Sequence, residues 1–286
     1  MTEVFSGNLI LAAILTLVTQ AIQIGAYSAR YAGIVTGRIA TAISLFSLLV
    51  TASRLASLFM VPSLGAIADK TSNAALKAHP PVVGPAALHV FDLQMRVVVA
   101  AGSLGILLGA LLLPVFLVMF VRGIAAFERL GSVPAALTRL FDPRVIADLL
   151  RSLKPPPFRF SDFPITAVPR MLLIANTLLF AVYSVGVVAA YYASVIVLDA
   201  RTTATGLSGL VNGIGTVAFS LFIDPTTAFI VDQTVRGERP RRDVLAMIFW
   251  LVVTAFVGTV LAQLILYPAA EYIAAVANFW VNHSKH

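Results

Sequence analysis

The sequence contains no cysteine and few charged residues, and both absences restrict what the protein can be. Without cysteine, disulfides, thiolate metal sites and cysteine nucleophiles are excluded. Charged residues make up only 12% of the 286 positions, and a soluble domain of this size needs about twice that share. An HExxH zinc motif and a nucleotide-binding loop are also missing. We therefore expect no metal, no cofactor and no direct use of ATP.

In place of charged residues, the chain contains long apolar segments. It is 59% hydrophobic, and several apolar runs exceed the roughly 20 residues that cross a bilayer. Because a spanning segment must satisfy its own backbone hydrogen bonds, we predict an all-α integral membrane protein. The start, MTEVFSGN, lacks a basic region and a cleavage site, so we expect a first span there and not a removable signal. Six spans are predicted: Asn8–Ala26, Ile39–Val61, Val97–Val121, Met171–Leu198, Thr203–Ile223 and Val244–Leu266.

Positive charges predict the orientation of these spans. Of the twenty Lys and Arg residues, fourteen lie in the first, third and fifth loops, including Arg30 and Arg38. The opposite side has five, among them Arg96 and Arg201. The excess of Lys and Arg on one side places that side in the cytoplasm and both termini outside. The net charge of +7 thus indicates cytoplasmic loops and anionic lipid contact, with no nucleic-acid partner.

The long connector between the third and fourth spans has a helical pattern of its own. In DPRVIADLLRSL, Asp142 is a candidate N-cap and Pro143 suits the first turn. Apolar and charged residues fall on opposite faces, as in a helix that lies in the membrane interface. An ordinary positive loop remains the alternative.

A fifteen-residue stretch occurs twice. SLFMVPSLGAIADKT at 57–71 and SLFIDPTTAFIVDQT at 220–234 agree at seven positions, where composition alone would give about one or two. Each copy belongs to the middle span of a group of three. Because three is odd, the second group must enter the membrane from the opposite face, which predicts a 3+3 inverted repeat. The expected organisation is a first repeat at 1–121, a basic cytoplasmic connector at 122–169 and a second repeat at 170–286.

The repeat holds a proline and an aspartate at matching places. Pro62 and Pro225 should kink or end the second and fifth helices, since proline removes a backbone donor. We interpret them, with Asp69 and Asp232, as paired gates or hinges; the alternative is that they simply end helices at the water interface. Asp69, Asp224 and Asp232 are also candidates for proton coupling by position alone.

Polar side chains recur on one face of the second and fifth spans. Because lipid would not satisfy them, the two faces should meet each other or a wet cavity. In the second span they are Thr41, Ser44, Ser47, Thr51, Arg54 and Ser57; in the fifth they are Ser208, Asn212, Thr216, Ser220 and Asp224. An arginine within a span costs about 2.5–3.5 kcal/mol to insert, so Arg54 should face protein or water. It is a candidate for binding substrate, or else a structural arginine paired with a carboxylate such as Asp224.

An enzyme is not expected. The sequence GLSG at 206–209 imitates the serine motif of rhomboid-type intramembrane proteases. Ser208 would need a base, and all four histidines lie outside the predicted spans.

The segment from Ala26 to Asp69 resembles the characteristic N-terminal segment of the Amj family of bacterial lipid II flippases. The resemblance rests on Ala26-Tyr27-Ser28, Arg30, Ala32-Gly33, Arg38, Ser44-Leu45-Phe46, Ser53-Arg54 and Pro62. Length, span number and the basic connector also fit. This family is unrelated in sequence to the larger MurJ transporters.

The resemblance implies that the protein moves undecaprenyl-pyrophosphate-linked disaccharide-pentapeptide (lipid II) between leaflets of the bacterial cytoplasmic membrane. Arg30, Arg38 and Arg54 would then receive the pyrophosphate, and Arg201 would take an equivalent place near the outer face. Asn212 would contribute a polar contact. Because six helices enclose little space for so large a headgroup, we expect either a groove open to lipid or a homodimer that forms the path.

The alternative functions are an ion-coupled transporter of a small soluble solute and a scaffold protein.

Overall fold

The computed structural model describes residues 5–79, 81–132, 143–152 and 162–283, and these contain helices and no strand. Six of its segments are long and apolar enough to cross a membrane, which confirms the predicted class and span number. They are Gly7–Thr36, Ile39–Leu76, Pro85–Leu111, Arg170–Ile196, Leu198–Val235 and Arg241–His283. Several apolar side chains on their outer surfaces are exposed, as lipid-facing residues would be.

Three of these spans are composed of more than one helical piece. The first consists of α1 (Gly7–Ala26) and α2 (Ser28–Thr36), and the second of α3 (Ile39–Leu58) and α4 (Met60–Leu76). The fifth consists of η3 (Leu198–Ala200), α10 (Arg201–Ala218), a π-helical turn η4 (Phe219–Ile223) and α11 (Asp224–Val235). The single-helix spans are α5 (Pro85–Leu111), α9 (Arg170–Ile196) and α12 (Arg241–His283).

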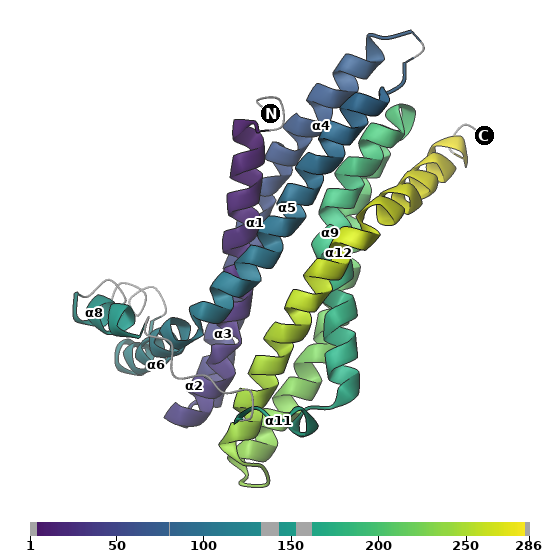
Figure 1. Cartoon of the computed structure of the whole chain (residues 1–286). Helices are drawn as coiled ribbons and strands as arrows, with labels where there is room; N and C mark the ends of the chain where they lie inside the picture. The colour runs from purple at the N-terminus through teal and green to yellow at the C-terminus, as the bar shows by residue number, and fades with distance from the viewer. Residues whose placement is uncertain (1–4, 80, 133–142, 153–161, 284–286) are drawn as a thin grey trace.

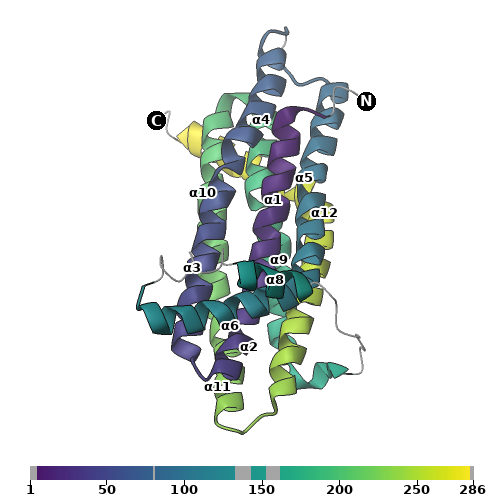
Figure 2. The ribbon, with the colours of Figure 1, turned by 90° about the vertical axis from the view of Figure 1, so that its left-hand side faces the viewer.

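Two helices lie across the bundle. In Figure 2, α6 (Leu113–Leu130) and α8 (Pro143–Arg151) run crosswise to the spans, and in Figure 1 they project from its side. A short turn, η2 (Ile165–Ala167), precedes α9. The predicted helix in the connector is confirmed over Pro143–Arg151, whereas its proposed cap, Asp142, lies outside the described residues. Arg122 of α6 pairs with Asp148 of α8, so an ion pair links the two crosswise helices.

The prediction for the third span was wrong in its bounds. The apolar run Val97–Val121 belongs to two helices, because the chain turns at Leu112 and Pro114 lies in the first turn of α6. The span itself begins earlier, at Pro85, and includes Asp92 and Arg96. These two charges are tolerated because they pair at 2.7 Å. Arg96 also donates to the Gln263 carbonyl at 2.8 Å, which ties α5 to α12.

The middle spans of the two halves are both interrupted close to their prolines. In the second span α4 begins two residues before Pro62, and in the fifth Pro225 is the second residue of α11, directly after the π-helical turn. The expected helix interruptions are therefore confirmed. In Figure 1 the second span rises from α3 to α4 at the top, whereas the fifth descends to α11 at the bottom. The two proline segments thus run in opposite directions; an exact symmetry between the halves stays a prediction.

Close packing is concentrated in two helix pairs, α1 with α5 and α9 with α12. Glycines make both contacts possible. A Cβ on Gly105 would lie 2.3 Å from the carbonyl oxygen of Leu17, and one on Gly258 would lie 2.5 Å from that of Thr177. The small-residue pattern at Gly105 and Gly109 therefore has the packing role that such patterns predict. A Cβ on Gly209 or Gly213 would meet nothing within 4 Å, so these glycines of α10 pack no helix in this chain.

This difference predicts opposite effects of the same substitution. Gly258→Ala should lower the free energy of unfolding by about 1–3 kcal/mol, because the new methyl group collides with backbone. The matched control Gly209→Ala should be neutral or raise it by up to about 1 kcal/mol, since alanine is the better helix former. Equilibrium unfolding of both variants in mixed detergent micelles measures this. Equal effects would contradict the packing assignment.

Candidate functional site: a cationic groove between two interrupted helices

A groove runs along the bundle from its middle to the end at which α11 lies. It is formed by three adjoining pockets, which we call the upper, middle and lower pockets. The upper and middle pockets share Gln23 and Tyr183, and the middle and lower pockets share Phe46 and Asp224. In Figure 2, α3 and α10, which contribute to its walls, lie on the left-hand side of the bundle. The lower pocket is the roomiest of the three, at about 390 Å³, against about 70 Å³ for the middle one.

The middle pocket brings together polar groups from both halves of the chain. Arg54 of α3 lines it on one side, and Thr216 of α10 and Asp224 of α11 line it on the other. The predicted meeting of the two polar faces is thus confirmed for these three residues. The side chain of Asn212, also on α10, lies outside the described part of the chain.

Arg54 has a free guanidinium. Among the described residues, none forms a hydrogen bond or ion pair with that group, and its side chain is only partly buried at the pocket wall. The sequence left open whether Asp224 pairs with this arginine. Asp224 instead pairs with Arg30, so this carboxylate is not the partner of Arg54.

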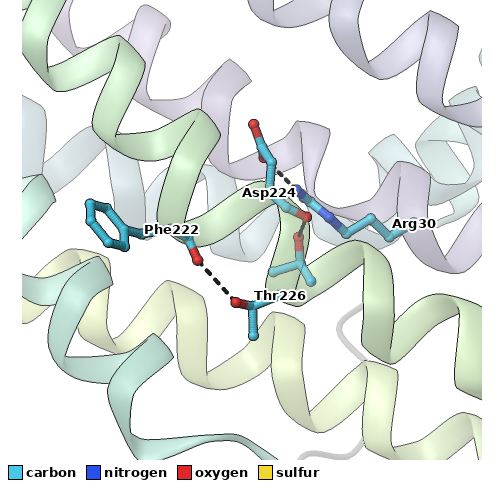
Figure 3. Close-up of polar contacts among 5 residues, drawn as sticks. Arg30, Phe222, Asp224 and Thr226 are labelled. Carbon is cyan, nitrogen blue, oxygen red and sulfur yellow. Dashed lines mark hydrogen bonds and ion pairs between the residues drawn. The ribbon is translucent and has the colours of Figure 1, made fainter.

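Arg30 lies between the middle and lower pockets and was expected in a loop. It is in fact part of α2, within the first span, because the helix restarts at Ser28 after a break at Tyr27. Its Nη2 donates to Oδ1 of Asp224 at 3.1 Å, a contact drawn in Figure 3. The guanidinium also lies over two rings, 5.1 Å from that of Tyr27 and 4.6 Å from that of Phe46. These cation–π contacts explain how a charge that is only 10% exposed is held there.

The turn that carries Asp224 is loosened on its N-terminal side. Residues Phe219–Ile223 form a π-helical turn, and Pro225 has no N–H to donate to the preceding turn. The Thr226 hydroxyl donates to the Phe222 carbonyl at 3.1 Å, and that of Thr227 to the Asp224 carbonyl at 3.0 Å (Figure 3). Side-chain hydroxyls thus add hydrogen bonds to two backbone carbonyls that precede Pro225.

The other predicted residues lie away from the middle pocket. Arg38, at the corner between α2 and α3, pairs with Glu128 of α6. Arg201, at the start of α10, donates to Asn73 Oδ1 at 3.5 Å. Asp69 is exposed on α4, at the opposite end of the bundle from α11. Asp232 lines the lower pocket and pairs with Arg236 at 3.2 Å.

Sequence reasoning missed the aromatic and amide lining of the groove. Tyr27 and Phe46 enclose Arg30, and Thr19 and Gln20 line the upper pocket. The buried Thr19 Oγ1 and Gln20 Oε1 have no partner among the described residues. The spacing of Tyr27 and Arg30, three residues apart in a helical sequence, was the available signal for the first of these contacts.

The six apolar spans, with a groove that contains arginines between two interrupted helices, define a multi-pass α-helical membrane protein. Residues 15–277 match the family model Amj, described as alternate to MurJ. The chain belongs to the Amj family, which confirms the resemblance noted in its N-terminal segment. It is 30% identical over 266 residues to the lipid II flippase Amj of Bacillus subtilis (strain 168), covering 92% of this chain and 94% of that protein. No solved structure matches the chain.

The two arginines of the groove should differ in their effect on stability. Arg30→Ala should lower the free energy of unfolding by roughly 1–3 kcal/mol, because it removes two cation–π contacts and leaves Asp224 without its partner. Arg54→Ala should change it by less than about 0.5 kcal/mol, since no partner is lost. Unfolding of the purified variants in detergent measures both. A loss at Arg54 as large as that at Arg30 would contradict the assignment of Arg54 as free.

Proposed function

We propose that this protein is a lipid II flippase of the bacterial cytoplasmic membrane. It moves the undecaprenyl-pyrophosphate-linked peptidoglycan precursor from the inner to the outer leaflet. The single observation that carries the proposal is the free guanidinium of Arg54 in a groove that also holds Arg30. Full-length similarity to a protein named as a lipid II flippase supports the choice of substrate.

In this proposal the headgroup travels along the groove while the polyprenyl chain stays in lipid. Arginine presents a planar fork of donors that matches phosphate oxygens, and a charge-assisted contact of this kind is stronger than a neutral one. Exposed apolar side chains of α3 and of the fifth span, such as Leu55, Leu58, Leu221 and Phe222, offer the chain an apolar surface. No bond is made or broken, so no catalytic residue is proposed.

The remaining predicted residues have proposed places along this path. Arg38 and the basic connector attract the anionic lipid at the cytoplasmic entrance, and Arg201 receives it near the outer face. Asn212 adds a polar contact on α10. Pro62 with Asp69, and Pro225 with Asp232, form the outer and cytoplasmic gates of two inverted repeats at 1–121 and 170–286, joined by the connector at 122–169. A homodimer that lines the path from two protomers is a second way to accommodate so large a headgroup.

Complementation tests the function. Expression in bacteria depleted of MurJ should restore growth and lipid II at the outer surface. Arg54→Ala should reduce that surface signal by about tenfold or more, whereas Arg54→Lys should keep part of it, because the charge remains. Arg170→Ala, an exposed arginine outside the groove, is the matched control. Full rescue by Arg54→Ala at normal membrane levels would exclude the groove as the path.

The proposed orientation can be tested separately, and the lack of cysteine makes the test clean. Val82 lies between α4 and α5, and Glu238 lies between α11 and α12, at opposite ends of the bundle. In intact cells an impermeant maleimide should label Val82→Cys and leave Glu238→Cys unlabelled until the membrane is opened. The reverse pattern would place the basic loops outside.

A further inference from the structure

The contact between Arg30 and Asp224 uses only part of what the arginine can offer. Nη2 donates to a single carboxylate oxygen, whereas the buried Nη1 has no acceptor among the described residues. The arginine side chain is nine-tenths buried, but that of Asp224 is half exposed. Arg30 is therefore a buried cation with one unused donor, Nη1. Its partner, Asp224, is exposed enough to exchange this contact for solvent.

A phosphate group can satisfy this arginine better than Asp224 does. Its oxygens can accept from Nη1 and Nη2 together, in the bidentate arrangement that favours arginine at phosphate sites. The lower pocket leads to this arginine, because Arg30 lines it, and Asp224 lines both the lower pocket and the middle pocket that holds Arg54. Nη1 becomes accessible to the phosphate when Asp224 leaves.

Asp224 is also placed to move when it is displaced. It is the first residue of α11, directly after the π-helical turn, and its N–H donates to Phe219 instead of continuing the regular helix. The Arg30–Asp224 pair joins α2, in the first half of the chain, to α11, in the second. Breaking it removes an ionic contact between the halves at the lower pocket. The middle pocket, at about 70 Å³, must widen for any sugar-bearing headgroup to pass.

We propose that Asp224 is a resident counter-ion that the diphosphate of the substrate displaces from Arg30, and that this exchange separates α11 from α2 and widens the groove. The proposal rests on the proposed function and adds to it a mechanism that couples substrate binding to opening. Asp224 acts as an internal competitor: it compensates the charge of Arg30 when the groove is empty and is exchanged only for an anion that offers more acceptors.

Binding to the full-length protein in lipid nanodiscs tests the exchange, with farnesyl diphosphate as the probe and farnesol as the control for its apolar chain. Asp224→Asn removes the competing charge with little change of shape, so the Kd for the diphosphate should fall about three- to tenfold. Arg30→Gln should weaken binding, and adding Asp224→Asn to Arg30→Gln should change nothing further. Inorganic pyrophosphate, tested in parallel, should show the same order of variants.

The outcomes separate the two proposals. If wild type binds in a manner that requires Arg54, but Asp224→Asn does not tighten binding, the exchange is wrong and the proposed function stands. If no variant binds the diphosphate, both are overturned. If farnesol binds as well as farnesyl diphosphate, the site recognises the chain and not the anion, which also overturns the exchange.

A distance measurement tests the opening itself and does not depend on transport. Spin labels at Val35→Cys in α2 and Val235→Cys in α11, two exposed positions, should move apart when farnesyl diphosphate is added. Asp224→Asn should shift the distance distribution toward the separated state without any probe. Labels at Val182→Cys in α9 and Val260→Cys in α12 report the closely packed pair and should not move. An unchanged α2–α11 distance in wild type under saturating probe would contradict the coupling.

Discussion

An arginine within a membrane span must find either a partner or a wet surface, and the groove is organised around two arginines that meet this requirement differently. Arg30 is stacked on Tyr27 and Phe46 and paired with Asp224, so its charge is compensated inside the protein. Arg54 has no such partner among the described residues and lies at the wall of the middle pocket. Among the described residues, one cation of the groove is thus paired and the other is not.

The packing of the bundle explains why the groove lies where it does. Glycines allow α1 to approach α5, and α9 to approach α12, so closely that a single methyl group would collide with backbone. The two pairs also contact each other, through α5 with α9 and α12, and the interrupted spans α3–α4 and α10–α11 pack against them. The glycines of α10 at 209 and 213 pack against no neighbour.

The middle spans of both halves are interrupted. A straight helix of 38 residues would move as one rod, whereas the second and fifth spans each divide near a proline. In the fifth span the division carries Asp224, the residue that contacts the opposite half of the chain. The ion pair between the halves and the interruption of the fifth span therefore involve one residue. The two spans run in opposite directions in Figure 1.

The sequence alone determined the class, the number of spans, the family and the two proline interruptions. These follow from hydropathy, from a repeat and from local backbone chemistry, which act over short stretches of chain. It did not determine where the third span ends, because one apolar run can serve two helices and only packing decides where it turns at Leu112. Nor could it decide which arginine Asp224 would pair with. Arg30 and Arg54 are both far from Asp224 in the chain, and only the tertiary structure, by stacking Arg30 between two rings beside α11, assigned the pair and left Arg54 free.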